Sequence, residues 1–277
     1  MESLKEVNSQ TDLTEYLMRK AQNHISYKHY TTYETLNKIF EEPYFRFTSI
    51  GYLNDISERY YIEDKISPYV YDYFVGCFSY SRDENVAMWM LYGGKGKSGI
   101  CLDFQQKHIK QMLTNQLFLK YENKFIEIPK SYYDISLSDV IYYSEKEENF
   151  NYIYYVKRGD EALKLWRHKL NTSAHYVKNM AWAYEHECRI IIRMNLDKLC
   201  NLVPGTIEYI YLPIDEILKD LKESKRIILS PNFEERVEKD FYKESDLGHL
   251  IDWDLCKGCK KNVLYQTLSP NPSNLRP

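Results

Sequence analysis

Short strand-like runs alternate with short helix-like segments along the chain, and this alternation limits the folds open to it. Ile25–Thr31 is rich in β-forming residues, Thr32 can cap a helix over Tyr33–Glu41, and Tyr44–Ser49 alternates large apolar with polar residues. After Pro204 the order strand, helix, strand recurs. The pattern therefore predicts a mixed α+β fold.

The remaining elements follow from the same periodicities. We expect a helix over Asp160–Ala181, because apolar residues there recur every three or four positions with no Gly or Pro. Residues 105–157 look less regular, with one strand at 139–144. The other expected strands are 74–81, 100–104, 187–193, 207–212 and 226–230, and the other expected helices are 4–22, 83–92 and 214–222.

Three regions are predicted from this order. Residues 1–24 form an N-terminal helical extension, residues 25–235 form one domain, and residues 236–277 form a C-terminal helical segment with a frayed tail. All motifs discussed below fall within 25–235 except for one cysteine pair.

Composition excludes several classes of protein. Lys and Arg number 37 against 40 Asp and Glu, so the charge of -3 is not that of a basic nucleic-acid coat protein. No apolar run reaches the roughly 18 residues of a membrane span, and the N-terminus lacks the apolar stretch of a signal peptide. We expect a cytoplasmic globular protein without membrane contact, whose six cysteines are reduced thiols.

Several ordered motifs carry a family resemblance. They are KHYTT, FRFTSIGYLNDISE, CFSYSRDENVAMWMLYGGKGKSGICLDF, KNMAWAYEHECRI and RIILSPN. Together they resemble the domain of unknown function 2971 family of bacteria and phage, over roughly residues 25–235. Ile56 departs from the family, which usually has Pro there. The residues that fit its motifs are Asn54, Asp55, Glu58, Met88, Trp89, Tyr92, Trp182, Glu185, Glu187 and Arg189.

A second resemblance supplies a chemistry. A His on a first strand, a strand ending in Thr-Ser and a late Glu-x-Glu are similar to the ADP-ribosyltransferase superfamily. That resemblance implies a split mixed β-sheet flanked by helices, with NAD as the substrate. Tyr92 or Tyr60 would take the place of the aromatic residue that stacks on nicotinamide. The resemblance assigns NAD binding to His29, Tyr30, Thr31, Thr48, Ser49, Asn54 and Tyr92.

Two glutamates are the predicted catalytic residues. Cleavage of the nicotinamide–ribose bond develops positive charge on the ribose, which a carboxylate such as Glu187 can stabilise. Glu185 would orient or deprotonate the acceptor. Residues two apart in a strand share a face, so both can line one cleft if the strand begins by 185. The alternative is an exposed strand edge with two solvated carboxylates.

Two other motifs indicate different chemistry. GGKGKSG at 93–99 lacks the spacing of a phosphate loop and precedes a strand, so nucleotide hydrolysis is rejected. Cys256 and Cys259 could bind zinc with His249 or Cys200, but a second clear ligand pair is missing. We predict no metal site, and leave zinc at this pair as the alternative.

The leading interpretation is an NAD-consuming ADP-ribosyltransferase that modifies an unknown protein or nucleic-acid acceptor. The resemblance implies a toxin or antiphage effector, with a possible antitoxin or defence-system partner. The alternatives are an NAD glycohydrolase on the same fold and a non-catalytic module that senses a nucleotide or a phage protein.

Overall fold

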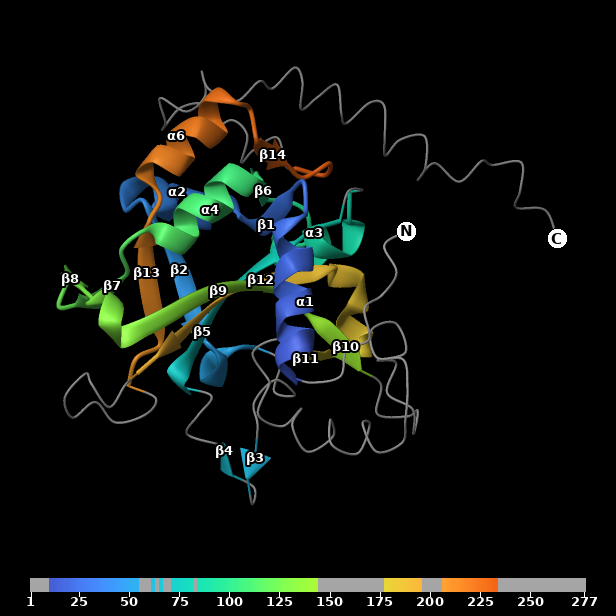
Figure 1. Cartoon of the computed structure of the whole chain (residues 1–277). Coiled ribbons are helices and arrows are strands. Elements are labelled where there is room, and N and C mark those ends of the chain that lie inside the picture. Colours follow the sequence, from blue (N-terminus) through green and yellow to red (C-terminus); the bar gives the residue numbers. More distant parts are fainter. Residues whose placement is uncertain are drawn as a thin grey trace. The chain divides into compact units, whose positions relative to one another are not determined.

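A computed structural model of the chain describes seven ranges of residues (Figure 1). They are 10–54, 61–62, 65–66, 71–81, 84–143, 177–195 and 206–233. The chain divides into two compact units that interleave along the sequence. Unit 1 contains the described residues within 1–27, 44–83 and 105–214, and unit 2 those within 28–43, 84–104 and 215–277.

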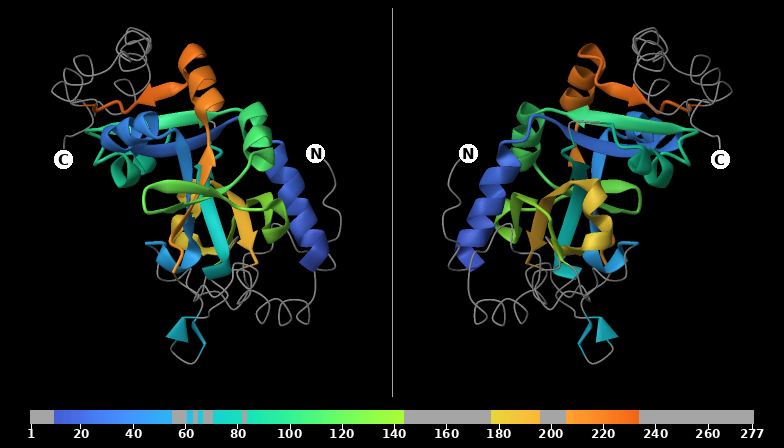
Figure 2. Two further views of the ribbon diagram at one scale, coloured as in Figure 1. Left: turned by 90° about the vertical axis from the view of Figure 1, so that its left-hand side faces the viewer. Right: turned by 90° about the vertical axis from the view of Figure 1, so that its right-hand side faces the viewer.

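Unit 1 is built on an antiparallel sheet. Its strands follow the order β9, β12, β5, β2, β13, β7, β8, and each neighbouring pair is antiparallel. Figure 2 shows β13 running beside β2. The bounds are β2 Tyr44–Ser49, β5 Tyr73–Ser79, β7 Phe118–Tyr121, β8 Lys124–Glu127, β9 Tyr133–Asp139, β12 Glu187–Met194 and β13 Tyr209–Pro213.

Smaller elements complete unit 1. A separate parallel pair joins β10 (Ile141–Tyr143) to β11 (Val177–Asn179). Helix α1 (Gln10–Gln22) contacts β9 and almost fully buries Leu17 and Ala21. The others are η1 Ile50–Tyr52, β3 Tyr61–Ile62, β4 Lys65–Ile66, α4 Gln106–Thr114, η4 Lys130–Tyr132 and η7 Met180–Glu185.

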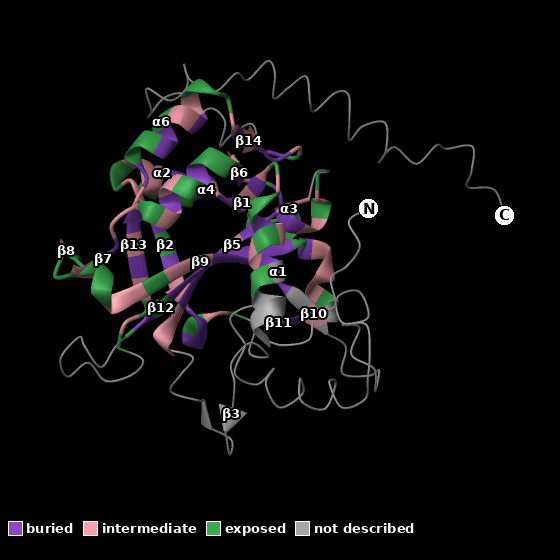
Figure 3. Ribbon diagram, viewed as in Figure 1, coloured by how far each residue is buried: buried purple, intermediate pink, exposed green. Residues whose placement is uncertain are grey.

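The sheet of unit 1 is central to its core. β12 lies between β5 and β9, so seven of its eight residues are buried (Figure 3). β2 alternates, with Phe45 and Phe47 buried. Both rings press on Gly76 of β5, where a Cβ atom would lie 2.7 Å from Phe45 Cε1 and 2.8 Å from Phe47 Cε1. Only a glycine lets β2 and β5 pack this closely.

The described part of unit 2 contains strands in the order β14, β6, β1 and three helices. Thr32 ends β1 and caps α2, because its Oγ1 accepts a hydrogen bond from Thr35 N at 3.4 Å. Asn85 caps α3 in the same way. The bounds are β1 Tyr27–Thr32, α2 Tyr33–Glu41, α3 Val86–Tyr92, β6 Gly99–Phe104, α6 Asp215–Glu223 and β14 Ile227–Leu229.

Most predicted elements are confirmed, and two predictions are wrong. The predicted helix to Ala181 fails at its end, because Val177–Asn179 is a strand and Met180–Glu185 a 3-10 helix. Its part before 177 lies outside the described residues. The region 105–157 is more regular than expected: its described part, to 143, forms α4 and β7–β10.

The fold class is mixed α+β with a large antiparallel sheet. The predicted limits at 24 and 235 stay predictions, although α1 packs within unit 1. Cys77, Cys101 and Cys188 are thiols. In the part of the chain that the structure describes, no helix has the length and apolar character needed to span a membrane.

Candidate functional site

A turn between η7 and β12 places the two predicted catalytic glutamates. Asn179 caps η7 by accepting a hydrogen bond from Ala181 N at 2.9 Å. Glu185 ends this helix, and Glu187 is the first residue of β12. His186 between them has a left-handed backbone, with φ 45° and ψ 56°. This left-handed residue joins the helix to the strand, and the carboxylates on either side of it belong to the same cluster.

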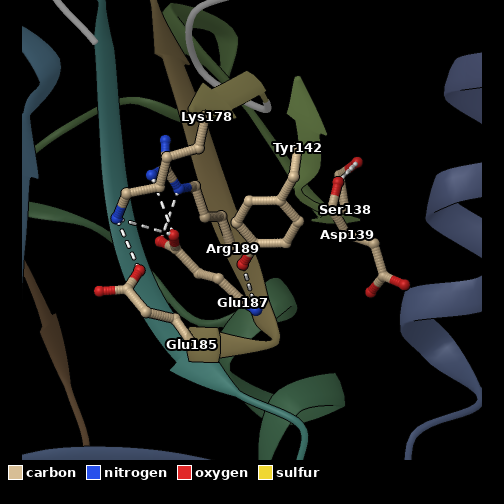
Figure 4. A network of polar contacts seen from close by, with 7 residues as sticks. All are labelled: Ser138, Asp139, Tyr142, Lys178, Glu185, Glu187 and Arg189. Atoms are coloured by element: carbon tan, nitrogen blue, oxygen red, sulfur yellow. Dashed lines mark hydrogen bonds and ion pairs between the residues drawn. The ribbon is translucent and has the colours of Figure 1, made fainter. Parts of the chain in front are cut away.

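Two cations hold these carboxylates (Figure 4). Lys178 Nζ lies 2.7 Å from Glu185 Oε2 and 3.2 Å from Glu187 Oε2. Arg189 Nε donates to Glu187 Oε1 at 2.7 Å, and its Nη2 donates to Oε2 at 3.2 Å. We call Lys178, Glu185, Glu187 and Arg189 the charged cluster. Its charges balance, as they must where burial removes water from ionised groups.

Burial and pairing act in opposite directions on Glu187. Its exposed fraction is 3 %, and burial alone would raise the pKa of its carboxyl group. The charges of Arg189 and Lys178 outweigh that effect and lower the pKa to about 2. Glu187 is therefore a permanent anion at neutral pH. It offers a fixed negative charge and no proton.

Two neutral groups complete the surroundings of Glu187. The thiol of Cys77 on β5 forms a hydrogen bond with its carboxylate, and burial raises the pKa of that thiol. The Tyr142 hydroxyl accepts a hydrogen bond from Glu187 N at 2.8 Å. Burial, followed by the charge of Glu187, raises the pKa of Tyr142. Both groups stay protonated and add no charge to the charged cluster.

A second polar group lies on the other face of the β9–β12 pair, toward α1 (Figure 4). Asp139 is fully buried, and its Oδ1 is 2.7 Å from His24 Nε2. Its Oδ2 lies 3.0 Å from Lys20 Nζ, an ion pair not aligned as a hydrogen bond. The His24 ring stacks on Tyr80 at 4.0 Å. This group connects α1 to β9, which pairs with the strand that carries Glu187.

Two expectations about the glutamates are corrected by this geometry. Glu185 is not in the strand, so its shared site with Glu187 does not come from strand alternation. The turn at His186 brings the two together instead. The alternative of two solvated carboxylates at a strand edge is also wrong, because Glu185 is 2 % exposed. Arg189 pairs with Glu187.

The other predicted residues of unit 1 lie on or beside β2. Ser49 is fully buried at its end, and Thr48 is partly exposed on the opposite face. Asn54 is exposed. β2 is separated from β12 by β5, on which Val75 pairs with both Thr48 and Ile191. Thr48 and Ser49 thus lie two strands away from Glu187, and Asn54 follows η1.

The remaining nucleotide-binding candidates belong to unit 2. His29, Tyr30 and Thr31 lie on β1, where Tyr30 packs edge-on against the Trp89 ring at 4.8 Å. Burial raises the pKa of Tyr30, so its hydroxyl stays neutral. Tyr92 ends α3 with 38 % of its surface exposed. Tyr30 is therefore a core residue of this unit, and Tyr92 a surface residue.

Several candidates lie outside the described residues. They are Asp55, Glu58, Tyr60, Cys200, His249, Cys256 and Cys259. Among the residues that are described, no three His, Cys, Asp or Glu side chains group as metal ligands.

Lys178 and Tyr142 were missed as site residues by sequence reasoning. Lys178 opens the motif KNMAWAYEHECRI, so a signal for it was present. Tyr142 lies on β10, about 45 positions before its partner in the chain, and no local pattern links the two. The group of His24, Lys20 and Asp139 likewise joins distant segments and has no sequence signature.

Comparison with known proteins identifies one family. Residues 88–190 match the model of the family described as protein of unknown function (DUF2971). This confirms the first resemblance over a span that runs from α3 into β12 and includes the charged cluster. No curated protein and no solved structure matches the chain.

Proposed function

We propose that the chain is an NAD-consuming enzyme of the ADP-ribosyltransferase kind, with Glu187 as its catalytic carboxylate. The main support is the sharing of one cation by two buried carboxylates. Lys178 Nζ lies 2.7 Å from a carboxylate oxygen of Glu185 and 3.2 Å from one of Glu187. Both carboxylates therefore attract the same positive charge. A ribose that is losing nicotinamide develops charge of the same sign. The position of this amine therefore suggests where that charge would be stabilised.

Each residue of the charged cluster has a part in this proposal. Arg189 keeps Glu187 ionised and oriented, because it donates two hydrogen bonds to the carboxylate. Lys178 moves aside for the ribose, and it already lies 4.8 Å from the centre of the Trp182 ring, which can retain it by a cation–π contact. With Arg189 holding Glu187 and Lys178 displaced, the negative charge of Glu187 faces the substrate.

The reaction needs one further group. The bond between ribose C1′ and nicotinamide breaks, and its electron pair leaves with nicotinamide. A hydroxyl of the acceptor, or water, forms the new bond to C1′. Once Lys178 has moved, Glu185 accepts the proton that this nucleophile loses. With a macromolecule as nucleophile the protein is a transferase, and with water it is a glycohydrolase.

The rest of the proposal is supported by resemblance alone. It includes the split mixed sheet of the superfamily and the role of a toxin or antiphage effector with an antitoxin or defence-system partner. Binding of NAD by His29, Tyr30, Thr31, Thr48, Ser49, Asn54 and Tyr92 has the same support.

A second candidate is a non-catalytic module that senses a nucleotide or a phage protein. Both oxygens of Glu187 are hydrogen-bonded and the residue is 3 % exposed. A carboxylate in this state can also act only as a brace between β11 and β12. In that case Glu187 stabilises the fold and no bond of NAD is broken.

Nicotinamide release separates the two candidates. Purified protein is incubated with NAD, alone and with cell lysate, and both nicotinamide release and labelling of macromolecules are measured. We expect Glu187→Gln to lose both by about a hundredfold or more. Glu185→Gln should lower labelling and leave measurable NAD hydrolysis. Equal activity of the wild type and Glu187→Gln would contradict the assignment.

Two controls complete the experiment. Glu223→Gln removes an exposed carboxylate at the end of α6 and should leave activity unchanged. Circular dichroism must show that each variant is folded. If the wild type binds NAD in calorimetry without releasing nicotinamide, the sensing module is the better description.

A further inference from the structure

One face of four neighbouring strands in unit 1 carries aromatic and basic side chains. On β2 and β13, buried residues alternate with partly exposed or exposed ones. The buried side contributes Phe45, Phe47, Ile210 and Leu212 to the core. The other side, with its neighbours on β7 and β8, forms what we call the aromatic face: Tyr44, Arg46, Tyr209, Tyr211, Lys120 and Phe125.

Strand register places these residues on the same side of the sheet. Tyr211 of β13 is directly opposite Arg46 of β2 and opposite Phe118 of β7. Lys120, two residues after Phe118, is directly opposite Phe125 of β8. Residues paired across a ladder share a face, as do residues two apart along a strand. The aromatic face therefore extends over four strands, β2, β13, β7 and β8.

Ring contacts join these side chains into one surface. Tyr44 stacks on Phe125 with ring centroids 3.9 Å apart and planes 13° from parallel. Phe125 also packs edge-on against Tyr211 at 5.4 Å, and Tyr211 lies 6.5 Å from Tyr209. The rings restrain one another, so their positions are set before any ligand arrives. Such preorganisation lowers the entropic cost of binding.

Two cations lie directly over rings of this surface. Arg46 Cζ is 4.1 Å from the centre of the Tyr209 ring, and Arg46 is exposed. Lys120 Nζ is 5.2 Å from the centre of the Phe125 ring. An exposed guanidinium on a ring face, such as that of Arg46, can still donate outward N–H groups to an anion. The surface therefore combines stacking platforms with positive charge.

We propose that the aromatic face binds single-stranded nucleic acid. Unpaired bases stack on aromatic side chains and on guanidinium planes, while their phosphates pair with neighbouring cations. In a duplex the base faces are already stacked on one another, so they cannot stack on these rings. Glu127, opposite Phe118, also lies on this side of the sheet and limits the net positive charge, so stacking contributes more than charge. The inference requires no NAD chemistry.

Binding of labelled oligonucleotides tests the proposal. Fluorescein-labelled oligouridylate and oligothymidylate of about twelve nucleotides, within the site sizes of single-strand binding proteins, are titrated with the full chain while anisotropy is recorded. We expect dissociation constants below about 100 µM at about 50 mM salt, with weaker binding at 200 mM. Tyr209→Ala and Arg46→Ala should each weaken binding about tenfold. Duplex DNA of the same length should bind more weakly.

Matched controls separate this face from general surface effects. Tyr121→Ala removes an aromatic ring that is 64 % exposed on the opposite face of β7. Arg193→Ala removes an exposed arginine of β12. Both variants should bind like the wild type. The proposal is overturned if the wild type binds neither oligonucleotide, if duplex binds equally well, or if the control variants lose as much affinity as Tyr209→Ala.

Sedimentation velocity addresses the other possible occupant, a second copy of the chain. We expect the same sedimentation coefficient for the wild type and Tyr209→Ala. If the wild type is a dimer that Tyr209→Ala dissociates, the aromatic face is a protein interface and the nucleic-acid proposal is wrong.

Discussion

Arg189 and Arg46 lie in the same sheet of unit 1 and have opposite surroundings. Arg189 is fully buried and bonded to Glu187 at 2.7 Å. Arg46 is exposed and lies on the Tyr209 ring. A buried cation must be matched by an anion, since desolvation of an unpaired charge is prohibitive. An exposed cation on a ring needs no such match. The charged cluster therefore keeps a carboxylate ionised and oriented, whereas the aromatic face presents a cation at the surface.

Replacing each arginine by methionine tests this comparison most directly. Arg189→Met leaves Lys178 alone against two buried carboxylates, so we expect a loss of about 3–5 kcal/mol in the free energy of unfolding. Arg46→Met should change it by less than about 0.5 kcal/mol. Urea denaturation monitored by circular dichroism measures both. Arg193→Met, at an exposed site on β12, is the control for Arg189→Met. Similar losses at 189 and 46 would break the comparison.

Acid should remove the contribution of Glu187 in a defined range of pH. Its pKa is lowered in the fold from 4.5 to about 2. The stabilisation is therefore complete above pH 4.5 and is lost as pH falls toward 2. The stability difference between wild type and Glu187→Gln should shrink by on the order of 3 kcal/mol over this range. Denaturant titrations of both proteins at several pH values measure this difference.

The group of Asp139 on the opposite face of the β9–β12 pair should have a smaller effect. Asp139→Asn removes the charge that pairs with Lys20 and His24, and we expect a loss of about 1–3 kcal/mol. Asp134→Asn, at an exposed site on the same strand, should change stability by less than about 0.5 kcal/mol. Thermal melts of both variants provide the measurement. Equal melting temperatures would show that α1 is not held by Asp139.

The smallest effect is expected within the aromatic face itself. Phe125→Leu removes the stacking on Tyr44, which contributes about 0.5–1.5 kcal/mol for a favourable aromatic pair. Tyr121→Leu, at an exposed ring without this stack, should cost less. Urea denaturation compares them. A larger loss at 125 than at 189 would indicate that the aromatic face is a structural core and not a binding surface.

Local signals in the sequence were sufficient for much of the fold. The strand Tyr44–Ser49 was predicted with its observed bounds, because large apolar and polar residues alternate along this segment. The helix at Tyr33–Glu41 was predicted because Thr32 supplies its cap. These elements depend on side chains within a few positions of one another.

The errors arise where distant partners decide the structure. Val177–Asn179 carries a helical pattern but pairs with Ile141–Tyr143, and this pairing overrides local propensity. The helix at Gln106–Thr114 has an unusual cap, in which His108 Nδ1 accepts a hydrogen bond from Gln105 N. No standard start signal marks it.

The candidate site was predictable only in part. Glu185 and Glu187 both pair with Lys178, but not through the strand alternation from which their proximity was predicted. They are linked by the ammonium group of Lys178 from β11 and lie on either side of His186, which has a left-handed backbone. The spacing of the two glutamates in the sequence predicts neither the turn at His186 nor the pairing with Lys178. The catalytic role of these residues stays a prediction.

Gly76 restricts how the sequence of this protein can vary. A Cβ atom there would lie within 3 Å of the rings of Phe45 and Phe47, so a larger residue requires at least one of these rings to shift. Substitution of Gly76 by a larger residue is therefore disfavoured while both phenylalanines remain. A library randomised at 45, 47 and 76 should return larger residues at 76 only together with smaller ones at 45 or 47.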